Sequence, residues 1–572
     1  MKTTITKLNK IIGGFAGISI MILVMVLLLP DTIFSQWQGM PVSVATNSQV
    51  NPVMTTDGSG GVIVAWQDKR NGKSEIFVQR MDANGLPIWT NNGIPICTLD
   101  SSFNPVIVSD GTGGAIIAWE SYRGSTTTDI FAQRVNSTGS VQWTLDGLPV
   151  CVVVFEQDTI SMISDGLGGA ILTWQDYRSN NGFPDVYAQR MNTIGTMLWT
   201  ANGVNICNQA ASQRGPKLVS DGLGGAFITW FDSRAGDYDI YTQRIGNAGA
   251  VQWTTNGIAT CTMATDQFRP DICSDDAGGV IITWYDFRST TDYNIYAQRQ
   301  GPLGAIIWAV NGVVINNNVA YTQDEPKIVP DGIGGAIISW TDYRTGVAPG
   351  TADIYVQRVN TTGTVQWTAT GIIICTAAGN QIKSQLVSDG NNGAYIVWED
   401  HRNAGNSDIY AQRIASNAAI TWSANGFGIS TMGFDQLNPM IVSNGNLGAI
   451  VVWQDYRSGN NYDIYMNGFN TGGIITEIGN ETTTPLTFSL SQNYPNPFNP
   501  VTKINYQLPM SGLVRLSVFN LLGQKIGELI NETQVAGNYS VDWNASEYPS
   551  GAYIYRLESG SFVDVKKMIL LK

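Results

Sequence analysis

Residues 104–151 read NPVIVSDGTGGAIIAWESYRGSTTTDIFAQRVNSTGSVQWTLDGLPVC, and this stretch decides the fold. It contains four short apolar runs, which are separated by a GTGG turn, a variable loop and an NSTG turn. Short β-rich runs between glycine-rich turns predict an antiparallel meander of four strands. Closely similar stretches precede and follow it, so the meander is one unit of a repeat.

The repeat is marked by a pentapeptide that begins with tryptophan, such as WQDYR at 174–178 and again at 453–457. Successive copies lie 53 to 58 residues apart, and their tryptophans are Trp66, Trp119, Trp174, Trp230, Trp284, Trp340, Trp398 and Trp453. A second series stands on the fourth run of each unit: Trp89, Trp143, Trp199, Trp253, Trp308, Trp367 and Trp422. About fifty residues and four strands per unit are typical of a β-propeller blade.

The second tryptophan series lacks its last member, and the missing member stands at the other end of the array. Residues 37–44, WQGMPVSV, match a fourth strand but precede the first unit, whereas the last unit has only three strands. We therefore predict an eight-bladed propeller over residues 36–470, in which residues 36–46 complete the last blade. Such a closure removes two open sheet edges.

Charged residues recur in every unit, which favours a structural role for them. We expect the arginine of the pentapeptide to pair with an acid across the next hairpin, for example Arg70 with Glu75 and Arg178 with Asp185. The DGxGG turns offer one carboxylate each, so tight-turn chemistry explains them better than calcium binding. A catalytic set is needed once, whereas these residues occur once per blade.

Composition excludes several classes of function. The formal net charge of −13 argues against nucleic acid as a partner. The only histidine, His401, fills a tyrosine position of the pentapeptide, which argues against histidine-based zinc sites and Ser-His-Asp triads. Five of the six cysteines stand at one equivalent position of successive units, so we interpret them as packed thiols rather than disulfide partners. We predict no cofactor, no metal site and no catalytic residues.

The N-terminus carries basic residues followed by about twenty mostly apolar ones, which is typical of a secretory signal peptide over residues 1–35. The alternative is a retained membrane anchor. After cleavage of the signal peptide we expect no membrane span.

The loops that differ between units are the place to look for binding, because function resides where a repeat scaffold varies. On one face these loops carry unlike residues that we expect around the mouth of a central channel. The candidate ligand-binding residues are Phe103, Asp158, Arg214, Phe268, Arg269, Asp324, Glu325 and Lys383. Aromatic rings beside acids and amides suit sugars or peptides, although the same residues could simply seal the loops between blades.

Beyond a polar linker at 471–487, residues 488–572 contain NYPNPFNPVTKINYQLP, an LLGQ turn, SGAYIYRL and the ending KKMILLK. Alternating apolar residues predict a small Ig-like β-sandwich of roughly seven strands. In these motifs and their order, the segment resembles the C-terminal sorting domain of type IX secretion substrates. The resemblance implies the type IX translocon and sorting machinery as partners. It also implies a secreted or outer-membrane cell-surface protein of a Gram-negative bacterium.

Three hypotheses for the cargo remain open. The leading one is an exported, non-catalytic propeller that binds glycans or proteins, as an adhesin or scaffold. The second is a secreted glycan-cleaving hydrolase with acids at the channel mouth, which requires two carboxylates that converge. The acids considered for it are Asp158, Asp266, Asp324, Glu325 and Asp435. The third is a purely structural surface-layer component without a soluble ligand.

Overall fold

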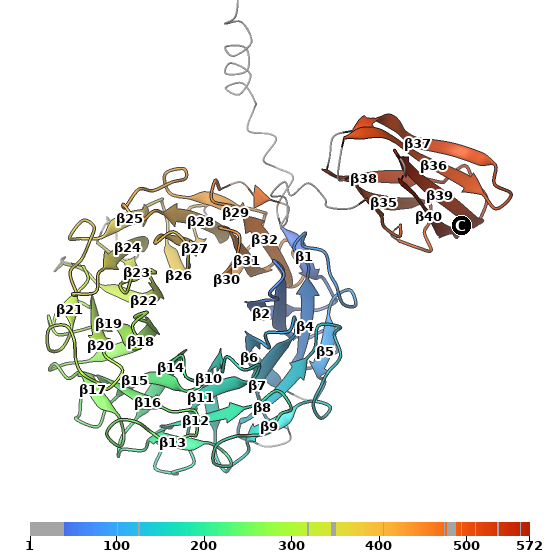
Figure 1. Ribbon diagram of the computed structural model, residues 1–572. Coiled ribbons are helices and arrows are strands. Elements are labelled where there is room, and N and C mark those ends of the chain that lie inside the picture. Colours follow the sequence, from blue (N-terminus) through green and yellow to red (C-terminus); the bar gives the residue numbers. More distant parts are fainter. Residues whose placement is uncertain are drawn as a thin grey trace, which may run out of the picture. The chain divides into compact units, whose positions relative to one another are not determined.

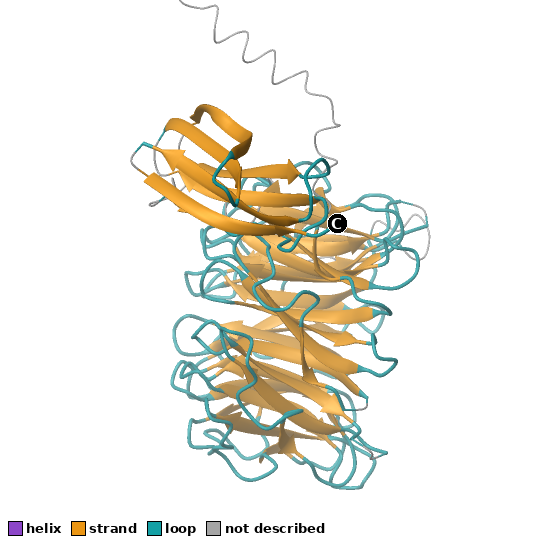
Figure 2. Ribbon diagram, turned by 90° about the vertical axis from the view of Figure 1, so that its right-hand side faces the viewer, coloured by secondary structure: helices purple, strands orange, loops and turns teal. Residues whose placement is uncertain are grey.

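The structure is a computed structural model, and its described part consists of strands, turns and loops without a helix (Figure 2). It describes residues 39–572 except 100, 124–125, 317–319, 345–350, 404, 474, 477–487, 494, 509–510, 535–536 and 561. The predicted signal peptide, Trp37 and most of the predicted linker lie outside the described residues. Nothing within the described ranges is a helix with the length and apolar character that a membrane crossing requires. The all-β prediction is confirmed.

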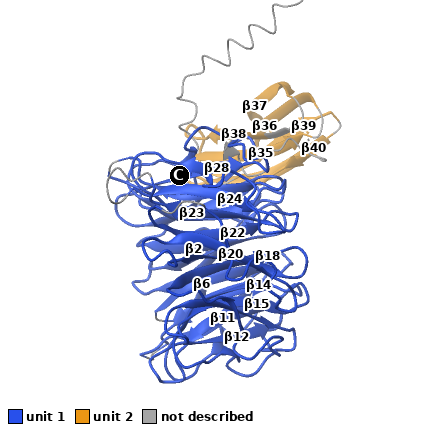
Figure 3. Ribbon diagram, turned by 90° about the vertical axis from the view of Figure 1, so that its left-hand side faces the viewer, with its two compact units in different colours: residues 1–479 blue, residues 480–572 orange. Residues whose placement is uncertain are grey.

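The chain divides into two compact units, residues 1–479 and residues 480–572 (Figure 3). The first unit holds eight antiparallel sheets, which we number 1 to 8 in chain order. Sheets 1 and 2 contain β2 (Gln49–Thr56), β3 (Val62–Asp68), β4 (Glu75–Met81), β5 (Ile94–Cys97), then β6 (Ser102–Ser109), β7 (Ala115–Ser121), β8 (Asp129–Val135), β9 (Leu148–Cys151). Sheets 3 and 4 contain β10 (Gln157–Ser164), β11 (Ala170–Asp176), β12 (Asp185–Met191), β13 (Val204–Cys207), then β14 (Gln213–Ser220), β15 (Ala226–Asp232), β16 (Asp239–Ile245), β17 (Ile258–Cys261).

The later sheets repeat the same order. Sheets 5 and 6 contain β18 (Gln267–Ser274), β19 (Val280–Asp286), β20 (Asn294–Gln300), β21 (Val313–Val314), then β22 (Gln323–Pro330), β23 (Ala336–Asp342), β24 (Asp353–Val359), β25 (Ile372–Cys375). Sheet 7 contains β26 (Gln381–Ser388), β27 (Ala394–Asp400), β28 (Asp408–Ile414) and β29 (Phe427–Ser430). Sheet 8 contains β30 (Gln436–Ser443), β31 (Ala449–Asp455), β32 (Asp463–Phe469), the short β33 (Ile475–Thr476) and β1 (Met40–Ser43).

Figure 1 shows these sheets in succession around a central opening, with the first strand of each sheet innermost. The hydrophobic cores lie between neighbouring sheets: one core joins Trp66 of sheet 1 to Ile450 and Ile464 of sheet 8. The tryptophans of the pentapeptide are completely buried in these cores. The tryptophans of the second series link neighbouring sheets through hydrogen bonds. Trp89 Nε1, for example, donates to the carbonyl of Ser137 in the next sheet at 3.1 Å.

The first and last parts of the array meet through β1. This strand pairs antiparallel with β32, with Met40 opposite Met466. In sheet 1 the ring of Trp66 packs so closely on Gly93 that a Cβ there would meet it at 2.4 Å. Gly39 has the same relation to Trp453 of sheet 8, where a Cβ would meet the ring at 2.6 Å. The N-terminal segment thus supplies the strand and the glycine that the last unit lacks.

The charged residues of the pentapeptide pair with each other, which corrects our prediction of cross-hairpin pairs. Arg70 binds Asp68, two residues earlier, through Nε at 2.9 Å and Nη2 at 2.6 Å. The same carboxylate accepts from Trp66 Nε1 at 2.7 Å. Across the hairpin it is Asp68 that lies opposite Glu75. Arg70 does not reach Glu75 because its guanidinium turns back to stack on Phe77, 3.8 Å from the ring centre.

The DGxGG turns and the cysteines have structural roles. Asp57 Oδ1 accepts from the backbone N–H groups of Ser59 and Gly61, both at 2.8 Å, while its Oδ2 accepts from Arg80 at 2.9 Å. The predicted tight turn therefore uses both oxygens of its carboxylate. All six cysteines are free and buried, which confirms packed thiols.

The second unit contains two sheets around one core. The smaller sheet has the order β34 (Ser489–Leu490), β35 (Val501–Leu508), β38 (Gly537–Asn544). The larger has the order β37 (Lys525–Gln534), β36 (Gly512–Asn520), β39 (Gly551–Ser559), β40 (Phe562–Leu570). Residues of both sheets, such as Ile504, Trp543, Leu516 and Tyr555, share the core. Seven strands in two packed sheets match the predicted small sandwich.

Candidate functional site

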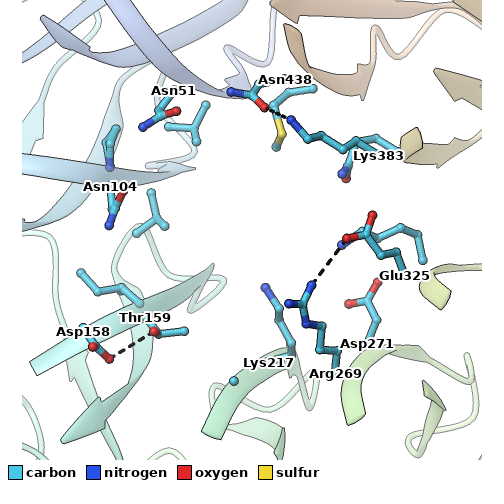
Figure 4. Close-up of a pocket in the computed structure, with 18 of the residues that line it drawn as sticks. Asn51, Asn104, Asp158, Thr159, Lys217, Arg269, Asp271, Glu325, Lys383 and Asn438 are labelled. Carbon is cyan, nitrogen blue, oxygen red and sulfur yellow. Dashed lines mark hydrogen bonds and ion pairs between the residues drawn. The ribbon is translucent and has the colours of Figure 1, made fainter. Parts of the chain in front are cut away.

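A cavity of about 970 Å³ is lined by the first strands of all eight sheets of the first unit. Side chains from opposite sheets point into it (Figure 4). The strands that line it are β2, β6, β10, β14, β18, β22, β26 and β30. Because most sheets contribute the same two or three positions of their first strands, the cavity is lined by rings of equivalent residues.

The innermost ring is created by a backbone irregularity. Near the start of each first strand the register shifts, as between Val50 and Val53 in β2, and the residue between them has a left-handed conformation. These eight residues have φ between 45° and 58° and all line the cavity: Asn51, Asn104, Thr159, Gly215, Arg269, Glu325, Lys383 and Asn438. We call them the bulge ring. A bulge re-aims the side chain that it carries, here toward the cavity.

A second ring lies two residues further along each first strand. Its members are Val53, Val106, Ser161, Lys217, Asp271, Lys327, Gln385 and Met440, and all except Ser161 line the cavity. In this second ring, as in the bulge ring, charged and uncharged residues lie on different sides of the cavity. Sheets 8, 1 and 2 contribute uncharged residues to both rings, whereas sheets 5 and 6 contribute a charged residue to each.

Charge is therefore distributed unevenly around the cavity. The side toward sheets 4 to 7 carries five cations, Arg214, Lys217, Arg269, Lys327 and Lys383, which we call the cationic arc. Only two acids, Asp271 and Glu325, line the same side. Opposite stand the amides of Asn51, Asn104 and Asn438, which we call the amide arc. In a chain with a net charge of −13, this local excess of cations stands out.

The cations of the arc differ in their partners. Arg269 makes an ion pair with Glu325 at 3.5 Å, and Lys383 Nζ binds Glu399 at 3.0 Å and Asn438 at 3.0 Å. For Lys217 and Lys327, no hydrogen bond or ion pair is formed with any residue that the structure describes. The side chain of Lys217 is open to the cavity, but protein surrounds it; this desolvation lowers the pKa of Lys217, nearby Lys327 lowers it further, and the charge of Asp271 acts in the opposite direction.

Two acids from neighbouring sheets converge on the other side of the cavity. Glu120 is buried, and desolvation, with a smaller contribution from Asp158, raises the pKa of Glu120 to about 7. Its oxygens accept from Asn104 Nδ2 at 3.0 Å and from the backbone N–H of Thr159 at 2.8 Å. Desolvation also raises the pKa of Asp158, which accepts from Gln175 Nε2 at 2.7 Å.

The bond from Glu120 to the bulge ring belongs to a repeated latch between sheets. Gln175 accepts in the same way from the backbone N–H of Gly215 at 2.8 Å, and Gln454 accepts from that of Asn51 at 3.0 Å. Glutamine occupies the position of Glu120 in sheets 1, 3 and 8, and glutamate occupies it in sheet 7, where Glu399 accepts from the backbone N–H of Asn438 at 2.6 Å. The sequence analysis missed Glu120, although an acid directly after the pentapeptide tryptophan was a visible signal.

The structure brings five of the eight predicted residues to the cavity: Asp158, Arg214, Arg269, Glu325 and Lys383. The other three are not among its lining residues. Phe103 packs on Tyr122, and Phe268 packs within an aromatic cluster with Phe231 and Tyr285. Desolvation and the neighbouring Glu325 raise the pKa of Asp324 to about 6.

Two further acids considered for hydrolysis make loop contacts. Asp266 accepts from the backbone N–H of Tyr238 at 3.0 Å, and Asp435 accepts from that of Ser407 at 3.0 Å. These equivalent bonds join neighbouring sheets, which is a scaffold role.

Comparison with known proteins identifies the end of the chain. Residues 492–571 match the secretion system C-terminal sorting domain family. The chain thus carries the type IX sorting domain that its motifs implied, and this domain marks it as an exported protein, secreted or at the cell surface. None of the curated proteins compared with the chain matches it.

Several solved structures are similar to the chain at low identity. The polysaccharide lyase Uly1 has 10% identity and a TM-score of 0.41 over 74% of this chain and 99% of its own. An α-L-arabinanase of Penicillium chrysogenum has 12% identity and a TM-score of 0.29 over 64% and 93%. A protein of unknown function from Dyadobacter fermentans has 11% identity and a TM-score of 0.30 over 56% and 96%. Similarity at this level assigns neither a ligand nor an activity to this chain.

Proposed function

We propose that this exported protein is a closed eight-bladed propeller that binds glycans or proteins in its central channel without catalysis. Residues 36–470 form the propeller, between a signal peptide at 1–35 and a linker at 471–487, and residues 488–572 deliver it to the surface of a Gram-negative bacterium. The pairing of β1 with β32 and the core shared by sheets 1 and 8 support the closure.

The observation that carries the proposal is the contrast between the scaffold and the channel lining. Trp66, Asp68 and Arg70 have counterparts in most sheets, and their polar atoms bind one another. The bulge ring occupies equally equivalent backbone positions, yet it holds asparagine, threonine, glycine, arginine, glutamate and lysine. Variation at equivalent backbone positions that line a cavity of about 970 Å³ is typical of a binding site.

Hydrolysis of glycans is the alternative, and the converging Glu120 and Asp158 are the observation that favours it. A general acid with a pKa near 7 would suit that reaction. However, Glu120 uses one oxygen for Asn104 and the other for the latch to Thr159, so both oxygens hold sheets together. We therefore favour binding over cleavage.

A screen of the whole chain against glycans and bacterial surface proteins tests the proposal, with soluble products measured in the same wells. We expect binding without release of sugar fragments. Gln385→Trp fills the channel and should weaken binding at least about tenfold. Leu167→Trp, at an exposed turn residue, is the matched control and should leave binding unchanged. Glycan fragments that vanish with Glu120→Gln would instead identify a hydrolase, and an absence of all binding would favour a structural surface-layer component.

A further inference from the structure

The cationic arc points to the chemical class of the ligand, an inference that rests on the proposed function. The surface of an acidic protein repels polyanions in general, so five cations around one cavity create a local exception. Cations inside a protein-walled channel act on a ligand more strongly than cations on an open surface, because less water screens them. Lys217 and Lys327 are the sharpest case, since neither forms a hydrogen bond or an ion pair with a described residue, and the charge of Asp271 favours the protonated form of Lys217.

Backbone conformation at the bulge ring gives an independent reason. Asparagine and glycine tolerate a left-handed backbone best, and sheets 1, 2, 4 and 8 have one or the other there. Arg269, Glu325 and Lys383 adopt the same conformation with φ of 45°, 49° and 54°, although their side chains disfavour it. Strain retained at a cavity points to a role for these charged side chains, and Thr159, which retains it at the same position of sheet 3, is the uncharged comparison.

The two arcs together suit a carboxylated sugar better than an acidic peptide. Carboxylates of the ligand would lie against the cationic arc, where guanidinium and ammonium groups bind them through charge-assisted hydrogen bonds. The amide arc, with Asn51, Asn104 and Asn438, offers donors and acceptors for hydroxyl groups. Asp271 and Glu325 lie between the cations and are acceptors for further hydroxyls. A chain of uronic acids presents both groups on every residue, whereas an acidic peptide lacks the hydroxyls.

We propose that the channel binds a uronic-acid polysaccharide, with its carboxylates on Lys217, Lys327 and Arg269 and its hydroxyls on the amide arc.

Binding of the whole chain to polygalacturonate, alginate and hyaluronate tests this proposal. At least one of them should bind, and the fully methyl-esterified form of the same polymer should bind at least about tenfold more weakly, because it has lost its charge. Lys217→Gln combined with Lys327→Gln should weaken binding by a similar factor and should reduce its sensitivity to salt.

The bulge ring supplies a control that separates binding from folding. Arg269→Asn relieves strain, so it should raise the melting temperature while it weakens uronate binding. Thr159→Asn relieves strain at the equivalent position away from the cationic arc, and should raise the melting temperature without a comparable loss of binding. A higher melting temperature together with weaker uronate binding in the Arg269 variant is not expected if Arg269 has only a structural role.

Three results would overturn the inference. If none of the three polyuronates binds while a neutral glycan or a protein does, the proposed function stands and the ligand class is wrong. If polyglutamate binds as tightly as the best polyuronate, the site recognises acidic polypeptides. If nothing in either screen binds, the proposed function fails with it.

Discussion

At the residue scale, one carboxylate per sheet holds the pentapeptide together. In sheet 3, Asp176 accepts from Trp174 Nε1 at 2.8 Å and binds Arg178 through Nε at 2.8 Å and Nη2 at 2.5 Å. It is fully buried, so its charge needs the arginine and the buried indole needs an acceptor. Sheet 2 has Ser121 instead, and there Trp119 Nε1 has no hydrogen-bond partner among the residues that the structure describes. Sheet 2 thus shows a pentapeptide in which the aspartate, and with it the acceptor for the tryptophan, is missing.

We predict that Asp176→Ser destabilises the first unit by about 3 kcal/mol, because the half-buried Arg178 and the buried indole of Trp174 lose their shared partner. Thermal unfolding followed by tryptophan fluorescence measures the loss as a fall in melting temperature. Ser121→Ala is the matched control, since it removes only a hydroxyl that binds Ser102 at 3.1 Å, and should cost about 1 kcal/mol. Equal effects of the two substitutions would contradict the role assigned to the carboxylate.

At the element scale, β1 decides whether the array has open edges. It pairs with β32 and carries Val42 into the core that sheets 1 and 8 share, where Val42 is only 2% exposed. Without β1, the outer edge of β32 at Ile464–Met466 would be free to pair with another chain, whereas Gly468 and Phe469 would still pair with β33. The strand is short, so its effect depends on the buried side chains of Val42 and Ser43 and a few backbone hydrogen bonds.

Val42→Asp should therefore lower the melting temperature strongly, by about 3 kcal/mol or more in stability, since it buries an unpaired charge. Val44→Asp is the control: the same change two residues later, at a side chain that is 47% exposed, should have little effect. Size-exclusion chromatography would add a second readout, because the Val42 variant should also associate through its exposed edge. A stable, monomeric Val42→Asp protein would refute the closure by β1.

The sequence predicted the elements well because each was repeated. Four runs per unit, the two tryptophan series and the WQGMPVSV segment at 37–44 together predicted sheets 1 to 8 and the place of β1. The sorting domain was also predicted from the sequence, since its motifs occur in the order that is typical of that family.

The partners of the charged residues and the bulge ring were not predicted. Residues Asp68 and Arg70 are two apart on an extended chain, and only the turn after β3 brings them together. The bulges depend on the register between β-strands, and the residue types in a strand are weak predictors of that register. One signal was present: asparagine before proline recurs at 51–52, 104–105 and 438–439, at the left-handed positions.

At the scale of the whole molecule, buried acids accumulate because the hairpins of six sheets, all except sheets 2 and 5, place one acid opposite another. Asp176 lies opposite Asp185, and Asp232 lies opposite Asp239. Desolvation is the main cause that raises the pKa of Asp185 to about 6 and that of Asp239 to about 7, and the opposite aspartate adds to both. The pKa values of Asp129, Asp408 and Asp463 are raised to about 6, mainly by burial.

These raised pKa values make stability depend on pH in a definite direction. The folded state holds protons on these acids up to about pH 6 or 7, whereas the unfolded chain releases them near pH 4. The folded state is therefore penalised increasingly as the pH rises from about 4 to about 7. We expect the melting temperature of the first unit to be higher at pH 5 than at pH 8, as measured by calorimetry in buffers of equal ionic strength.

Sheet 5 provides the matched test, because Asn294 lies opposite Asp286 where the other sheets have an acid. Asp239→Asn should raise the melting temperature at pH 8 and leave it unchanged near pH 4, where the native side chain is already protonated. Asn294→Asp should do the reverse, with a loss at pH 8 that shrinks on acidification. One pKa unit corresponds to about 1.4 kcal/mol, so either change should be easily resolved. Equal shifts at both pH values would show that packing, rather than protonation of the opposed acids, sets their contribution to stability.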